Sequence, residues 1–174
     1  REQILNFAKQ EKLVLGICNG FQVLAALGIF DTNFEQNCAL LPNEFPRYVC
    51  KWVRLKNASQ KCVWTRGIDE IDVPIAHGEG NFFTSPEVLS TLEKNDQIAL
   101  RYVDNPNGSL KDIAGICDES GRIFGLMPHP ERNLLFSQRP DFCTIKEKYQ
   151  REGKELPEFS DGKKIFENGV KFFG

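Results

Sequence analysis

Leu13-Val14-Leu15-Gly16-Ile17-Cys18-Asn19-Gly20-Phe21-Gln22-Val23-Leu24 is the stretch that decides the fold of this chain. An apolar run enters a Gly-x-Cys-x-Gly sequence, and a helical pattern of apolar residues leaves it. This order is typical of a nucleophile elbow, a sharp strand-to-helix turn, with cysteine in place of serine. The two glycines remove side chains that would clash in such a turn. We expect Cys18 to have a strained backbone and an exposed thiol at a helix N-terminus, where the helix dipole favours the thiolate. The alternative is an ordinary buried cysteine.

The bulk properties predict one globular domain that comprises residues 1–174. A net charge of −2 gives no sign of binding to nucleic acid or to an anionic membrane. No apolar run approaches the roughly 20 residues that span a bilayer. The six cysteines are widely spaced and form no C-x-x-C pair, which favours a reduced, cytoplasmic protein without a zinc site.

The periodicity of apolar residues predicts an α/β domain. A short continuous run before Cys18 is typical of a buried parallel strand, and hairpin-like segments later in the chain add antiparallel strands. A polar stretch with little periodicity over residues 137–160 predicts a long surface loop. We expect helices over residues 1–10, 21–27, 87–92 and 161–173, and strands over residues 13–17, 47–56, 61–64, 98–103, 113–117 and 122–127.

The sequence offers two histidines as a base for Cys18, and the surroundings of His129 favour it over His77. His129 follows a strand-like run and lies between two prolines, which restrict its backbone. Glu131 comes two residues later, on the same side of an extended segment, where it can orient the imidazole. We therefore predict a Cys18–His129–Glu131 triad. The alternative is a surface loop in which His-x-Glu occurs by chance.

Four segments carry a resemblance to a known family: Gly16-Ile-Cys-Asn-Gly-Phe-Gln22, Ala76-His-Gly-Glu-Gly-Asn81, Asn105-Pro-Asn-Gly-Ser-Leu110 with Asp112-Ile-Ala-Gly-Ile116, and Gly125-Leu-Met-Pro-His-Pro-Glu-Arg132. Together they resemble the glutaminase subunits of phosphoribosylformylglycinamidine synthase, which are class I glutamine amidotransferases. The resemblance implies a flavodoxin-like three-layer sandwich, with a mostly parallel sheet to which antiparallel strands are added.

The resemblance also implies roles for individual residues in glutamine hydrolysis. Cys18 would attack the side-chain amide of glutamine, and His129, oriented by Glu131, would protonate the leaving ammonia and then activate water. The backbone N–H of Asn19 would stabilise the oxyanion. The predicted substrate-binding residues are Asn19, Gln22, His77, Gly78 and Glu79, of which the last three line either the glutamine pocket or a partner interface.

The family resemblance implies partners as well. The ammonia would pass to a large synthetase subunit that uses ATP and Mg²⁺, and a small accessory subunit would complete the complex. The chain shows no phosphate-binding loop and no metal-ligand cluster, so we expect it to hold no cofactor of its own.

The chain departs from the family pattern before the elbow, because Cys18 comes only one short helix and one strand after Arg1. Class I amidotransferases carry several elements there, including a loop that supplies a second oxyanion donor. We therefore expect the domain to be truncated at its N-terminus. Since loss of one oxyanion donor costs roughly 100- to 1,000-fold in rate, residues 1–174 alone should lack full activity.

Two other functions fit parts of the pattern. A γ-glutamyl hydrolase or a cysteine peptidase of the same fold would also use Cys18 and His129. A scaffolding or redox-sensing subunit would need no base, although an exposed thiol of low pKa would oxidise readily.

Overall fold

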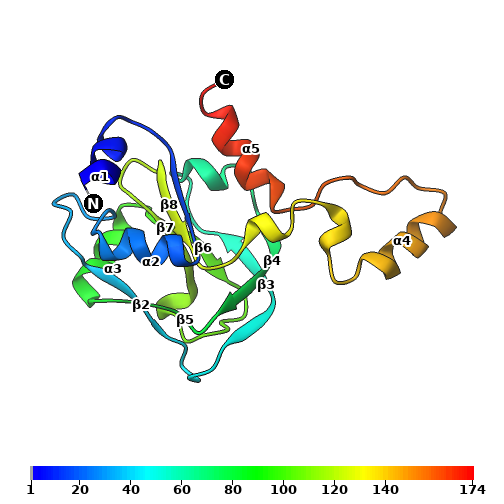
Figure 1. Cartoon of the computed structure of the whole chain (residues 1–174), viewed down its shortest axis with the longest axis horizontal. Helices are drawn as coiled ribbons and strands as arrows, with labels where there is room; N and C mark the ends of the chain where they lie inside the picture. The colour runs from blue at the N-terminus through cyan, green and yellow to red at the C-terminus, as the bar shows by residue number, and fades with distance from the viewer. Residues whose placement is uncertain (1) are drawn as a thin grey trace.

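The computed structural model describes residues 2–174 and is built on a six-stranded sheet with the order β1-β8-β7-β6-β3-β4 (Figure 1). β1 pairs in parallel with β8, and Gly16 lies opposite Gly125 in that pair. The strands of this sheet are β1 (Val14–Ile17), β3 (Val49–Asn57), β4 (Glu70–His77), β6 (Ile98–Tyr102), β7 (Ile113–Cys117) and β8 (Ile123–Leu126).

Five α-helices accompany the sheet: α1 (Glu2–Lys9), α2 (Asn19–Ala26), α3 (Pro86–Lys94), α4 (Phe142–Arg151) and α5 (Lys163–Lys171). The helices over residues 1–10, 21–27, 87–92 and 161–173 were predicted, and all four are confirmed within the described residues. No helix within residues 2–174 has the length and apolar character needed to cross a membrane.

Apolar side chains fill a core on each face of the sheet, which gives the three layers that the family resemblance implies. On one face, Phe21 and Leu24 of α2 pack with residues of β6, β7 and β8. On the other face, Ile165 of α5 and Trp64 pack with residues of β3, β4 and β6. Alternate residues of each strand point to opposite faces, so one short strand serves both cores.

The sheet is less parallel than expected. Among residues 2–174 only β1 and β8 pair in parallel, whereas β3–β4, β3–β6, β6–β7 and β7–β8 are all antiparallel. The expectation of a mostly parallel sheet is therefore wrong for the described residues, although the α/β class holds. The turn over residues 118–121 accounts for the antiparallel pair of β7 and β8, because a tight hairpin can join only antiparallel strands.

Three local expectations were incomplete or wrong. Residues 61–64 were expected to form a strand, but a 3₁₀ turn covers Val63–Thr65, because a short buried apolar run fits either conformation. A second, two-stranded sheet of β2 (Cys38–Pro42) and β5 (Glu79–Thr84) was not predicted. The expected loop over residues 137–160 contains α4.

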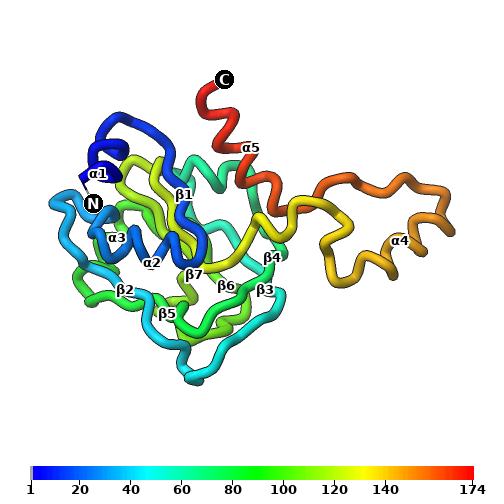
Figure 2. Tube along the Cα trace, viewed as in Figure 1, coloured from blue at the N-terminus to red at the C-terminus, as the bar shows by residue number. Residues whose placement is uncertain are grey.

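Residues 134–160 form a projecting segment, here called the arm, which carries α4 away from the body of the molecule (Figures 1 and 2). The two ends of the arm pair through a bridge between Leu135 and Phe159, and the N–H of Ser160 donates to the carbonyl of Leu134 at 2.9 Å. No side chain of α4 is buried. Its Tyr149 ring instead packs within the arm, beside Phe136.

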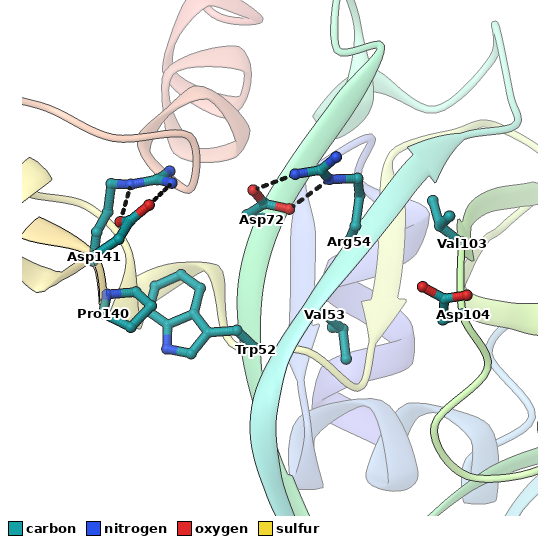
Figure 3. A pocket seen from close by; sticks show the side chains of 9 residues that line it. Trp52, Val53, Arg54, Asp72, Val103, Asp104, Pro140 and Asp141 are labelled. Carbon is teal, nitrogen blue, oxygen red and sulfur yellow. Dashed lines mark hydrogen bonds and ion pairs between the residues drawn. The ribbon is translucent and has the colours of Figure 1, made fainter. Parts of the chain in front are cut away.

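A cleft of about 480 Å³ lies where the base of the arm meets the outer strands (Figure 3). Two paired guanidinium groups face it: Arg54 binds Asp72 at 2.8 Å, and Arg139 binds Asp141 at 2.9 Å. Trp52 of β3 supplies an apolar wall. None of the predicted site residues lines this cleft, so it is separate from the site at Cys18. The two arginines of the cleft are already paired with carboxylates.

The arm should contribute little to stability, because it buries little apolar surface. Replacement of residues 137–157 by a short glycine-serine linker removes mainly exposed ion pairs, each worth about 0–1 kcal/mol. We expect Tm to fall by less than about 4 °C in a thermal unfolding experiment.

The matched control is Ile165→Ala, which removes a fully buried side chain from the core. Such truncations lower the free energy of unfolding by about 2–5 kcal/mol, so the Tm of this variant should fall clearly further than that of the arm deletion. An equal or larger loss in the arm deletion would show that the arm is part of the folding core.

Candidate active site

Cys18 occupies the sharp turn between β1 and α2, as the elbow motif predicts. Its backbone has φ 51° and ψ −107°, a left-handed conformation that costs energy for a residue with a side chain. The turn is held by the Cys18 N–H, which donates to the carbonyl of Leu126 in β8 at 2.8 Å. The strained residue is thus fixed at the carboxyl end of the parallel pair of β1 and β8.

The two elbow glycines have different roles. A Cβ at Gly16 would lie 2.5 Å from the Leu24 side chain and 2.8 Å from the backbone of Gly20, so close strand–helix packing requires glycine there. A Cβ at Gly20 would meet nothing within 4 Å. The steric explanation is therefore confirmed at Gly16 and wrong at Gly20, because Gly20 faces an open groove along β1.

The second half of the site is His129 with Glu131, directly after β8. The His129 N–H donates to the carbonyl of Pro74 in β4 at 2.8 Å, which ties this segment to β4. Nδ1 of His129 lies 2.6 Å from Oε1 of Glu131. When the Nδ1–H group of His129 donates a hydrogen bond to the Glu131 carboxylate, Nε2 carries the free lone pair that a general base needs.

Nε2 of His129 is buried and has no hydrogen-bond partner among residues 2–174. A nucleophile–base hydrogen bond is often loose before substrate binds and tightens in the complex. The arrangement therefore provides a base whose proton-accepting nitrogen is not occupied by another group. The structure shows the predicted carboxylate–imidazole pair directly.

The thiol of Cys18 is not the resting thiolate that the helix dipole suggested. Burial raises the pKa of Cys18, and this outweighs the backbone N–H of Asn19 and the guanidinium of Arg132, which both lower it. The Glu131 carboxylate adds a smaller increase in the same pKa. That expectation is wrong because a partly buried thiolate loses more hydration than one helix terminus restores. A nucleophilic role for Cys18 would consequently need a nearby base.

Gln22 and Asn19 have different surroundings. The backbone N–H of Asn19 is directed at the Cys18 sulfur, where it can stabilise negative charge. The side-chain amide of Gln22 donates to the backbone carbonyl of Glu79 at 2.9 Å, while the Glu79 side chain is exposed. Gln22 thus links the elbow helix to the first residue of β5.

The segment from His77 to Gly80, where β4 passes into β5, is fixed from several directions. The amide of Asn107 and the hydroxyl of Ser109 donate to the carbonyl of Gly80 at 2.7 and 3.2 Å. The carbonyl of Gly78 accepts from the N–H of Asn43 at 2.9 Å. The structure therefore brings the His-Gly-Glu-Gly and Asn-Pro-Asn-Gly-Ser segments together.

Three supporting residues were missed at the sequence level: Asn43, Asn107 and Ser109. Asn107 and Ser109 lay within a quoted motif, and their polar side chains in a turn were the available signal. Asn43 follows β2, and nothing in its sequence surroundings indicated that it would contact His77. Within residues 2–174, no group of three His, Cys, Asp or Glu side chains is placed to hold a metal ion.

Comparison with known proteins decides the family. The profile of the CobB/CobQ-like glutamine amidotransferase domain matches residues 1–173. The chain belongs to this family. This chain is 45% identical to the phosphoribosylformylglycinamidine synthase subunit PurQ of Methanococcus maripaludis. It is 44% identical to the subunit of the same name from Dehalococcoides mccartyi. The match covers 99% and 98% of this chain, and 70% and 68% of those relatives.

Solved amidotransferase structures agree with this result. The structure of PurLQS from Thermotoga maritima contains a chain with a TM-score of 0.72 and 34% identity, over 98% of this chain and 66% of that one. A glutamine amidotransferase from Methylobacillus flagellatus matches with a TM-score of 0.55 at 15% identity, which supports the fold alone. The class I amidotransferase fold is therefore confirmed.

Proposed function

We propose that this chain hydrolyses glutamine to glutamate and ammonia, as the glutaminase subunit of phosphoribosylformylglycinamidine synthase in purine biosynthesis. The observation that carries the proposal is the strained Cys18 elbow beside a His129–Glu131 pair with a 2.6 Å contact, in a chain 45% identical to a PurQ subunit.

The proposed reaction uses each of these groups in turn. Nε2 of His129 takes the thiol proton as the Cys18 sulfur attacks the amide carbon, and the Asn19 N–H stabilises the oxyanion. The imidazolium, stabilised by Glu131, gives its proton to the nitrogen as the C–N bond breaks, which releases ammonia. Water then attacks the thioester with His129 as base, and glutamate leaves as the Cys18 thiol is restored.

The ammonia requires an acceptor on another chain. The Thermotoga maritima neighbour belongs to an assembly called PurLQS, which supports a complex of this chain with a large synthetase subunit and a small accessory subunit. ATP and Mg²⁺ would bind the synthetase, so this chain needs no cofactor. The cysteines of residues 2–174 are all free thiols, which fits a cytoplasmic enzyme.

The alternative functions have less support. A γ-glutamyl hydrolase or a cysteine peptidase would use the same thiol and base, but the relatives that match nearly the whole chain are PurQ subunits. A redox sensor would need an acidic, reactive thiol, whereas burial raises the pKa of Cys18. A pure scaffold has no use for the part-buried His129–Glu131 contact.

The proposal is tested by covalent trapping in the complex with the synthetase subunits. A glutamine-mimicking electrophile should modify Cys18 alone among the six cysteines, as read by mass spectrometry of peptides. Excess glutamine should protect Cys18 from the electrophile. Modification of the exposed Cys50 or Cys143 in preference to Cys18 would contradict the assignment of the nucleophile.

A further inference from the structure

The turn that carries the base is attached to the outer edge of β4. Within residues 2–174 β4 is the last strand of the six-stranded sheet, so the backbone groups along its outer side have no strand partner. The carbonyl of Pro74 instead accepts the N–H of His129 at 2.8 Å. Two residues earlier on the same strand, the carbonyl of Asp72 accepts the side-chain amide Nδ2 of Asn133 at 2.6 Å. The segment is therefore held at two points, one before Glu131 in the chain and one after it.

Asn133 is also the point at which three parts of the fold meet. Its N–H donates to the carbonyl of Pro130 at 3.0 Å, which closes the 3₁₀ turn Pro130–Arg132. Its carbonyl accepts the N–H of Gly162, just before α5, at 3.0 Å. A Cβ at Gly162 would collide with the carbonyl oxygen of Pro130 and lie 2.7 Å from that of Asn133, so this close approach requires glycine. The side chain of Asn133 is fully buried between these segments.

The side-chain amide of Asn133 is only half used. Nδ2 donates to β4, but Oδ1 is buried and has no hydrogen-bond partner among residues 2–174. A buried acceptor without a partner destabilises a fold, and an apolar side chain of similar size would not carry that penalty. Exceptions of this kind concentrate at functional sites. The contribution of Asn133 therefore lies in the donor that joins the turn to β4.

The Glu131 carboxylate needs a fixed backbone because it has a second cation within reach. Its side chain is 37% exposed, and Nε of Arg132 lies 3.7 Å from the same Oε1 that contacts His129. The more exposed guanidinium thus competes with Nδ1 of His129 for one oxygen. The position of the turn decides which of the two partners the carboxylate keeps.

We propose that Asn133 is a positioning residue for the base, because its bond to β4 fixes the turn that holds Glu131 on Nδ1 of His129. This inference rests on the proposed glutaminase function. Without the Asn133 bond the segment keeps one attachment to β4, at His129, and the carboxylate is free to turn toward Arg132 or solvent. Asn133 acts on the reaction through Glu131 and does not bind the substrate.

The first test is Asn133→Leu in the complex with the synthetase subunits. We expect kcat for glutamine hydrolysis to fall roughly 10- to 100-fold, because a small misplacement of the base costs rate, while KM changes by less than about 2-fold. Ammonia-dependent synthesis should stay within a factor of about 2. Tm should change by less than about 4 °C, since loss of the unpaired Oδ1 offsets loss of the bond to Asp72.

Two further variants keep the donor question separate from the fit of leucine. Asn133→Ala removes the same donor with a smaller side chain and should show the same loss of kcat. Asn133→Gln retains an amide that can donate to the Asp72 carbonyl and should recover part of the rate.

A double-mutant cycle tests whether the effect runs through Glu131. In the Glu131→Gln background the carboxylate that Asn133 positions is already gone, so adding Asn133→Leu should lower the rate of Cys18 acylation by less than about 3-fold. A residue that only stabilises the fold would lower the rate by the same factor in both backgrounds.

The matched control is Gln97→Leu, which removes another buried amide that donates to a backbone carbonyl, that of Cys117 at 3.0 Å, outside the site. Its kcat should stay within about 2-fold of the unaltered complex.

The outcomes separate the two proposals. An unchanged kcat in both Asn133→Leu and Asn133→Ala, a loss confined to KM, or equal losses in the two backgrounds of the cycle would overturn the positioning role and leave the glutaminase function intact. If the unaltered complex does not hydrolyse glutamine, the proposed function fails and this inference fails with it.

Discussion

Cys18→Ser is expected to abolish glutamine-dependent synthesis in the complex, by at least about 10⁴-fold, and to leave ammonia-dependent synthesis within a factor of about 2. The serine hydroxyl is a much weaker acid than the thiol, whose pKa burial already raises. The elbow should still form, because its backbone rests on close packing at Gly16 and on the bond to Leu126. Product formation with either nitrogen source checks the prediction.

The controls for this variant are Cys50→Ser and Cys143→Ser, two exposed free thiols. Neither should change the rate with glutamine or with ammonia. Loss of both activities in Cys18→Ser would indicate that Cys18 holds the complex together rather than acting as a nucleophile.

Glu131→Gln is expected to lower kcat for glutamine hydrolysis by roughly 10³- to 10⁴-fold, with a much smaller change in KM. The carboxylate lies 2.6 Å from Nδ1 of His129 and fixes the tautomer whose Nε2 is a base. An amide in its place can donate its own proton to Nδ1 and so favour the wrong tautomer. Steady-state kinetics and the rate of Cys18 acylation in a single turnover measure the loss.

The matched control for Glu131→Gln is Glu155→Gln, which makes the same change at an exposed position on the arm. It should retain full activity. If Glu131→Gln lost less than about 10-fold, the contact with His129 would be only structural, and another group would have to orient the base.

The sequence was most informative where function depends on neighbouring residues. An apolar run, a close-packed glycine, Cys18 and a helical pattern lie within twelve positions, so local sterics alone define the elbow. His129 and Glu131 are two residues apart between prolines, so their contact also follows from local geometry. The observed φ of 51° at Cys18 and the 2.6 Å contact confirm both predictions.

The sequence was least informative where one segment needs a distant partner. β2 and β5 pair across about forty residues, and neither has a strong pattern of its own. Cys62, Val63 and Trp64 are apolar because they face the core beside α5, and burial of that kind does not distinguish a strand from a 3₁₀ turn. Helix α4 was read as a loop because its apolar stripe is short and packs mainly within the arm.

The sequence by itself therefore determined the elbow at Cys18 and the contact between His129 and Glu131, because short-range backbone geometry sets each of them. Only the tertiary structure decided the environment of these groups. The pKa of Cys18 depends on how much water the folded chain removes from the thiol. The attachment of Asn133 to β4 depends on Asp72, sixty-one residues away. Desolvation and long-range hydrogen bonds arise from contacts between distant segments, and these exist only once the chain has folded.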